Sequence, residues 1–93
     1  MPKDKDRLGR HEFFLVFIIN GEDCKVVTDP TAPLKLAVAQ ALRESGNTGR
    51  PPEEWEVRDV HGVLLEQPRT PKELQLHEGA RLFLSLKVGA GGV

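Results

Sequence analysis

The sequence predicts an α+β fold in which one β-sheet is covered on one face by a single helix. Two observations lead to this prediction. Five segments have the residue alternation or the apolar run of a β-strand, whereas only one segment has apolar residues at helical spacing. One helix with one apolar face needs one sheet to cover, so this arrangement is the simplest that buries both surfaces.

The first two strands are expected to form a hairpin. The first strand, at about 12–19, runs into Asn20-Gly21, the strongest two-residue signal for a hairpin turn. A turn of this length pairs Ile19 with Glu22 and so sets the register of the hairpin. One face should then carry Phe13, Leu15, Phe17, Cys24 and Val26, and the other Phe14, Val16, Ile18, Lys25 and Val27.

The helix is expected from about Ala32 to Ser45. Thr31 is a suitable N-cap, Pro33 would lie in the first turn, and Gly46 is placed to end the helix. The residues at helical spacing form one apolar stripe: Leu34, Ala37, Val38, Ala41 and Leu42.

Three further strands follow the helix. One is expected at about 54–60, after Pro51-Pro52, and a short one at about 63–66. Residues 70–73 have the pattern of a capping box with proline at N1, which predicts a single helical turn. In the last strand, Leu82, Leu84, Leu86 and Val88 alternate with Arg81, Phe83, Ser85 and Lys87, as in a strand with one buried face.

The chain divides into a domain with a tail at each end. Residues 1–11 mix both charges and hold one large apolar residue, so a disordered tail is expected. Residues 12–88 should form the domain, and residues 89–93 a flexible glycine-rich tail without packing side chains. A strand that leads into such a tail indicates that the carboxyl end is the reactive group. The sequence therefore suggests a protein that is attached to others, not an enzyme.

Composition argues against several other functions. The net charge of −1 gives no general attraction to nucleic acid or to an anionic membrane, and no apolar run approaches the ~20 residues of a membrane span. The single Cys24 and the absence of an apolar signal segment favour the cytoplasm. His11, His61 and His77 lack the spacing of metal ligands. The sequence also shows no grouping of a serine, a histidine and an acidic residue that would suggest a catalytic triad. Cys24 should point inward as an inert thiol.

Four local patterns occur in a characteristic order. They are Thr28-Asp29-Pro30 before the helix, Pro51-Pro52 after it, Leu65-Glu66 leading to Arg69-Thr70, and Leu82 to Lys87 ahead of Gly91-Gly92. In this order the chain resembles ubiquitin and the β-grasp family over nearly all of residues 13–92. The resemblance implies a mixed five-stranded sheet of order 2-1-5-3-4, with strands one and five parallel at its centre and one main helix across one face.

The resemblance also implies a covalent protein modifier with Gly91 and Gly92 as its active tail. An activating enzyme would use ATP to adenylate the Gly92 carboxylate and then hold it as a thioester, so the modifier itself needs no cofactor. A conjugating enzyme would pass the acyl group to a lysine amine, as an isopeptide bond, or to a hydroxyl of a target protein. Glycines suit a narrow enzyme channel because they have no Cβ.

Val93 follows the glycine pair, so a peptidase must expose Gly92 before it can react. A zinc metallopeptidase that trims or removes the modifier is therefore an expected partner; the alternative is that Val93 is a ragged end without function. Gly89 and Ala90 replace the basic residue near ubiquitin's tail. This departure fits a divergent bacterial system with its own enzymes.

The family's apolar recognition patch is altered in this chain. By alignment, Arg58 takes its strand-three position, and Phe83 and Ser85 take two strand-five positions. The solvent face of the hairpin offers apolar residues instead, which predicts a surface that binds a partner protein or a second copy of the chain. The alternative is that the N-terminal tail or the twist of the sheet covers part of this face. The predicted surface comprises Phe14, Val16, Ile18, Val27, Arg58, Phe83 and Ser85.

Two other functions remain open. A sulfur carrier of the same fold would use a thiocarboxylate at its glycine pair, although such carriers usually stop at those glycines and Val93 argues against one. A noncovalent binding module would have an idle tail, and deletion of residues 91–93 would leave its function intact.

Overall fold

The computed structural model describes residues 13–87. The predicted tails at 1–11 and 89–93 lie outside the described residues. In chain order the elements are β1 (Phe14–Ile19), β2 (Glu22–Val27), α1 (Leu34–Glu44), the short 3₁₀-helix η1 (Pro52–Glu54), β3 (Trp55–Arg58), β4 (Leu64–Leu65) and β5 (Arg81–Leu86).

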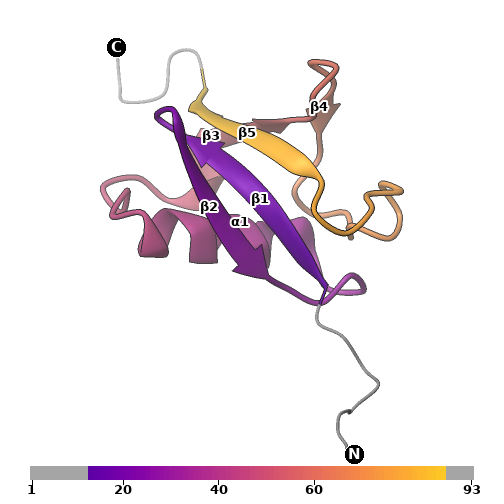
Figure 1. Ribbon diagram of the computed structural model, residues 1–93. Coiled ribbons are helices and arrows are strands. Elements are labelled where there is room, and N and C mark those ends of the chain that lie inside the picture. Colours follow the sequence, from indigo (N-terminus) through magenta and orange to yellow (C-terminus); the bar gives the residue numbers. More distant parts are fainter. Residues whose placement is uncertain (1–12, 88–93) are drawn as a thin grey trace, which may run out of the picture.

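The strands form one mixed sheet of order β2-β1-β5-β3-β4, and α1 crosses one face of it (Figure 1). β1 and β5 run parallel in the middle, and the other three pairs are antiparallel. Both the predicted α+β arrangement and the predicted strand order are confirmed. A parallel pair needs a long connection, and all the other elements, from β2 to β4, lie between β1 and β5 in the chain.

The hairpin has the predicted register. Asn20 and Gly21 both have positive φ values, 54° and 81°, as the tight turn between twisted strands requires. Ile19 is therefore the partner of Glu22, and the alternation of side chains follows the prediction. Leu15, Phe17 and Val26 on the helix side are fully buried, and Phe13 and Cys24 pack partly buried against the same core.

The predicted start of the helix was wrong by two residues. Thr31 does not cap it, because its N–H and its hydroxyl both donate to the Asp29 carboxylate, at 2.8 and 2.7 Å. These hydrogen bonds also lower the pKa of Asp29. The helix begins at Leu34, with Pro33 as its N-cap. Its first N–H groups donate to backbone carbonyls of Arg69 (2.8 Å) and Gln67 (3.0 Å).

The helix ends at Glu44, one residue before the predicted Ser45, and Gly46 stops it as predicted. This glycine has φ +79°, and its N–H donates to the carbonyl of Arg43 at 3.2 Å. The N–H of Asn47 donates to the carbonyl of Leu42 at 2.8 Å. The two bonds form a Schellman motif, which satisfies the last carbonyls of the helix. All five residues of the predicted apolar stripe are buried.

Replacing Gly46 with alanine should lower the free energy of unfolding by about 1–2 kcal/mol, because a side chain in the left-handed region is strained. Gly49→Ala is the matched control. Gly49 lies in the same loop without a left-handed φ, and a Cβ there meets nothing within 4 Å. Urea denaturation of both variants checks the prediction, and equal losses of stability would contradict it.

The strands after the helix are shorter than predicted. Glu54 belongs to η1, and β3 ends at Arg58 because the Asp59 carboxylate accepts the N–H groups of His61 (2.8 Å) and Val63 (3.0 Å). These bonds turn the chain sharply into β4. β4 pairs with β3 over two residues only.

The predicted capping box is present. The N–H of Thr70 donates to Glu73 at 3.1 Å, and the N–H of Glu73 donates to the Thr70 hydroxyl at 3.0 Å. The N–H of Leu74 then donates to the carbonyl of Thr70 at 3.0 Å, which closes one turn, but residues 71–75 form turns and not the predicted helical turn. This segment places Leu74 and Leu76 partly buried against the core.

One predicted core residue is exposed. Leu82 and Leu84 of β5 are buried, but Leu86 is 43% exposed. The pairing of β1 with β5 ends at Ile19 and Leu84, because β1 turns away there into the hairpin. Leu86 pairs only with Trp55 of β3, beyond the part of the sheet that the hairpin flanks.

Candidate functional site

The predicted partner surface lies on the sheet face opposite α1. Strand pairing places Phe14 beside Val27, and Phe83 between Ile18 and Arg58. Ser85 lies next along β5, opposite Glu56. The structure therefore brings the seven predicted residues onto one face, as the alternation in β1, β3 and β5 indicated.

Charged side chains interrupt the apolar part of this face. Arg81 of β5 and Asp23 of β2 form an ion pair at 3.3 Å, and β1 lies between their two strands. The Lys25 ammonium lies 4.4 Å from the centre of the Phe14 ring, as in a cation–π contact. Val16, beside Arg81 and Lys25, is half-buried as a result. Neither interaction was anticipated from the sequence.

Two of the predicted apolar side chains remain well exposed on the face, and Leu64, the strand partner of Arg58, is a third that was not predicted. Val27 is 42% exposed and Phe83 is 41% exposed. Arg58 beside Phe83 is held in place, because its guanidinium donates to the carbonyl of Gly62 at 2.9 Å and pairs with Glu56 at 3.4 Å. The exposed apolar residues on this face are thus separated by charged side chains, which are held in place by ion pairs and hydrogen bonds.

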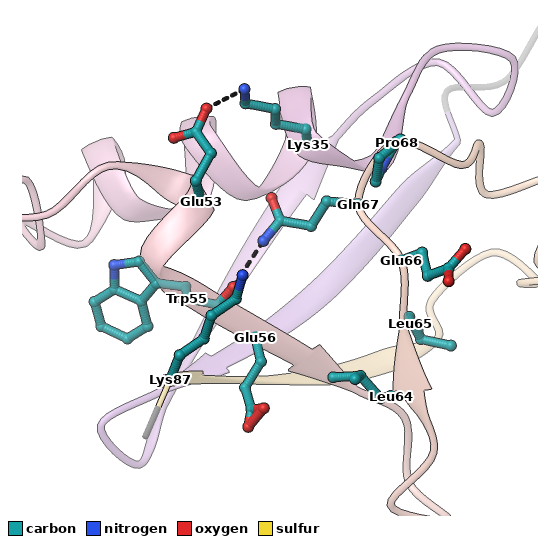
Figure 2. Close-up of a pocket in the computed structure, with 10 residues that line it drawn as sticks. All are labelled: Lys35, Glu53, Trp55, Glu56, Leu64, Leu65, Glu66, Gln67, Pro68 and Lys87. Atoms are coloured by element: carbon teal, nitrogen blue, oxygen red, sulfur yellow. Dashed lines mark hydrogen bonds and ion pairs between the residues drawn. The ribbon is translucent and has the colours of Figure 1, made fainter. Parts of the chain in front are cut away.

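The second part of the site is the end of β5. The N–H of Lys87 donates to the carbonyl of Glu54 at 2.9 Å, which ties the last described residue to η1. Nearby, Lys35 of α1 forms an ion pair with Glu53 (Figure 2). The hydrogen bond from Lys35 is the main cause that lowers the pKa of Glu53, and the positive charge of Lys87 contributes. The predicted reactive residues Gly91, Gly92 and Val93 lie outside the described residues.

A groove of about 560 Å³, which was not predicted from the sequence, lies at the sheet edge near this point (Figure 2). It forms where β4 is too short to cover β3. The amide nitrogen of Gln67 spans the gap and donates to the carbonyls of Trp55 (2.8 Å) and Pro52 (2.9 Å). The lining residues are Lys35, Glu53, Trp55, Glu56, Leu64, Leu65, Glu66, Gln67, Pro68 and Lys87.

A smaller hollow of about 390 Å³ lies between the β3–β4 turn and the segment before β5. His61 and His77 both line it. Within residues 13–87, however, no three histidine, cysteine, aspartate or glutamate side chains come together as metal ligands would. Nor does this part of the chain contain a helix long and apolar enough to cross a membrane.

Cys24 faces the helix, as predicted, but is only half-buried. Its sulfur lies 3.9 Å from the carbonyl oxygen of Ala41 and 3.9 Å from the carboxylate of Glu44. Burial is the main cause that raises the pKa of the thiol, and the negative charge of Glu44 raises it further. A thiol in this environment forms little of the thiolate that a nucleophile requires.

Comparison with solved structures identifies the fold. A de novo protein designed on the basis of ubiquitin superposes with a TM-score of 0.71 at 20% identity, over 88% of this chain and 96% of that protein. The match, together with the strand order, shows that this domain has the ubiquitin-like β-grasp fold.

Comparison of sequences identifies relatives. The uncharacterized protein y4jI of Sinorhizobium fredii (strain NBRC 101917 / NGR234) is 32% identical over 84 residues. The match covers 90% of this chain but 65% of that protein, so the chain spans slightly less than two thirds of the relative's length. The sequence profile of a family described as a protein of unknown function, DUF2604, matches residues 9–92. Because this match covers nearly the whole chain, the protein belongs to the DUF2604 family.

Proposed function

We propose that this protein is a ubiquitin-like modifier and that Gly92, once it is the carboxyl terminus, is joined to target proteins. One observation carries the proposal. In this ubiquitin-like domain the central strand β5 ends at Leu86. Lys87 and Val88 follow, and residues 89–92, which end in Gly91-Gly92, are all glycine or alanine. The match of the family profile extends through both glycines.

The chemistry would be carried out by partner enzymes. The Gly92 carboxylate attacks the α-phosphate of ATP and displaces pyrophosphate, and a cysteine of the activating enzyme then displaces AMP to form a thioester. A cysteine of a conjugating enzyme takes over the acyl group. A lysine amine or a hydroxyl of the target finally displaces that thiol. The domain acts as a carrier in these steps and contributes no catalytic residue.

The domain would supply recognition and a fixed point from which the tail extends. The Lys87–Glu54 hydrogen bond holds the end of β5, so the acyl carbon of Gly92 lies within five residues of an ordered anchor. At about 3.3–3.6 Å per extended residue, this tail could reach roughly 17 Å into an enzyme channel. The sheet face with Phe83, Val27 and Arg58 is the surface on which we expect the partner enzymes to dock.

The modifier would need a peptidase and a supply of ATP. A zinc metallopeptidase cleaves after Gly92 to expose the reactive carboxylate, and the same class of enzyme removes the modifier from its targets. The cytoplasm of a bacterial cell supplies the ATP that activation consumes.

Mass spectrometry of native cells tests the proposal. Trypsin cleaves after Lys87, so a modified target should carry residues 88–92 as a branch on a lysine, or on a hydroxyl-bearing residue. A sulfur carrier would instead give free protein in which one oxygen of the Gly92 carboxylate is replaced by sulfur. Recovery of the protein only in unattached, uncleaved form would rule out the modifier.

A further inference from the structure

The outer edge of β2 is open for pairing. In the hairpin, the pair next to the two-residue turn is hydrogen-bonded, and bonded pairs then alternate along the strands. The bond from the N–H of Thr28 to the carbonyl of Phe13 (2.9 Å) fits this alternation. The backbone groups of Asp23, Lys25 and Val27 therefore point away from β1, and within residues 13–87 they make no hydrogen bond.

The opposite edge of the sheet is closed by comparison. β4 is two residues long, and beyond it the side-chain amide of Gln67 donates a hydrogen bond to the carbonyl of Trp55. The N–H of Trp55 donates to the carbonyl of Pro52. β2, with six residues and a free row of donors and acceptors, is thus the edge that can accept another strand.

We propose that β2 pairs antiparallel with β2 of a second copy of this chain, about a two-fold axis at Cys24. This inference goes beyond the proposed function and does not depend on it. Asp23 of each copy then lies opposite Lys25 of the other in a hydrogen-bonded pair, and the two Cys24 residues face each other in the non-bonded pair between them.

Charge selects this register over its neighbours. The outward backbone groups belong to residues 23, 25 and 27, so the strands can slide only in steps that keep odd residues opposite odd residues. Moving the axis to position 23 places Asp23 opposite Asp23, and moving it to position 25 places Lys25 opposite Lys25. Like charges directly opposite each other are destabilising, whereas the register centred on Cys24 gives two Asp–Lys pairs.

The dimer is compatible with the rest of the fold. Asp23 keeps its ion pair with Arg81, which reaches it from the side of β5. In the strand order, β1 separates β2 from β5, so the end of β5 remains accessible. The helices of both copies lie on the same face, and each brings Glu44, 3.9 Å from the Cys24 sulfur, towards the axis. Glu44 therefore opposes dimer formation, and Glu44→Gln should strengthen it.

Sedimentation velocity of the full chain under reducing conditions provides the first test. Because the paired edge is short, we expect weak self-association, with a dissociation constant on the order of 0.1–1 mM. Lys25→Glu places two like-charged pairs in the interface and should weaken association about tenfold. The double exchange D23K/K25E restores opposite charges and should recover most of the loss.

Disulfide trapping provides the second test, since Cys24 is the single cysteine of the chain. Facing Cα atoms in a non-bonded antiparallel pair are about 4.5 Å apart, which suits a disulfide. Diamide oxidises the two thiols to one disulfide and takes up their two protons and two electrons. The matched control is C24A/V27C, whose more exposed thiols would lie roughly 20 Å apart across the axis.

We expect Cys24 to cross-link at least about tenfold faster than the cysteine at position 27, and K25E to slow this cross-link. Random collision predicts the reverse order, because a half-buried thiol reacts more slowly than an exposed one. A monomer at every concentration, or equal cross-linking from both positions, would overturn the proposal. Loss of association in K25E without recovery in D23K/K25E would overturn the register.

Discussion

Replacing Phe17 with alanine is expected to lower the free energy of unfolding by about 3–5 kcal/mol. Phe17 is 0% exposed and lies in β1, with Cys24 of β2 on one side and Leu82 of β5 on the other. Truncation removes a large apolar side chain and leaves a cavity between the sheet and α1. Small domains have only about 5–15 kcal/mol of stability, so urea denaturation should show a large fall in the midpoint.

Phe83→Ala is the matched control for this prediction. Phe83 lies on the neighbouring strand β5 but points to the solvent face, where it is 41% exposed. Its removal should cost about 1 kcal/mol or less, mainly from lost contacts with its cross-strand neighbours. If Phe83→Ala proved as damaging as Phe17→Ala, the assignment of the buried and the exposed face would be wrong.

The sequence predicted the sheet well because strand geometry is local. Side chains alternate along a strand, and Asn20-Gly21 determines the pairing of the hairpin without reference to the rest of the chain. The parallel pairing of β1 with β5 is different, since it depends on residues at opposite ends of the domain. Only the resemblance to ubiquitin predicted that pairing.

The start of the helix could not be predicted for a related reason. Thr31 has the chemistry of an N-cap, but Asp29 competes for its hydroxyl. The first helical N–H groups find their acceptors at Gln67 and Arg69, far along the chain. A local pattern contains no information about such a contact, so the apparent cap at Thr31 was misleading.

The sequence predicted which residues belong to the candidate surface, but not how far their side chains are exposed. The alternation in β1 and β5 placed Ile18 and Phe83 on one face, as observed. The partial cover over that face comes from Asp23 and Arg81, which are 58 residues apart in sequence. The edge groove likewise depends on how Gln67 meets Trp55, which only the folded chain reveals.

The largest functional effect is expected at Gly92. If Gly92 is the residue joined to targets, Gly92→Val places a branched side chain at the reacting carbon, inside a channel that accepts glycine. Misplacement of a reacting group by about 1 Å can cost roughly a hundredfold in rate, so attachment should fall by at least that factor. Cell extract with ATP and a tagged chain ending at residue 92 provides the assay, with heavier species measured by immunoblot.

Gly89→Val is the matched control, because it makes the same change three residues earlier in the same tail. Residue 89 precedes the glycine pair and is not the acyl donor, so attachment should fall much less than in Gly92→Val. Both variants should retain the melting temperature of the parent, since neither residue belongs to the described β-grasp core. Undiminished attachment of Gly92→Val would mean that another residue forms the bond. Equal loss in both variants would mean that the enzymes recognise the whole tail and do not select the glycine pair.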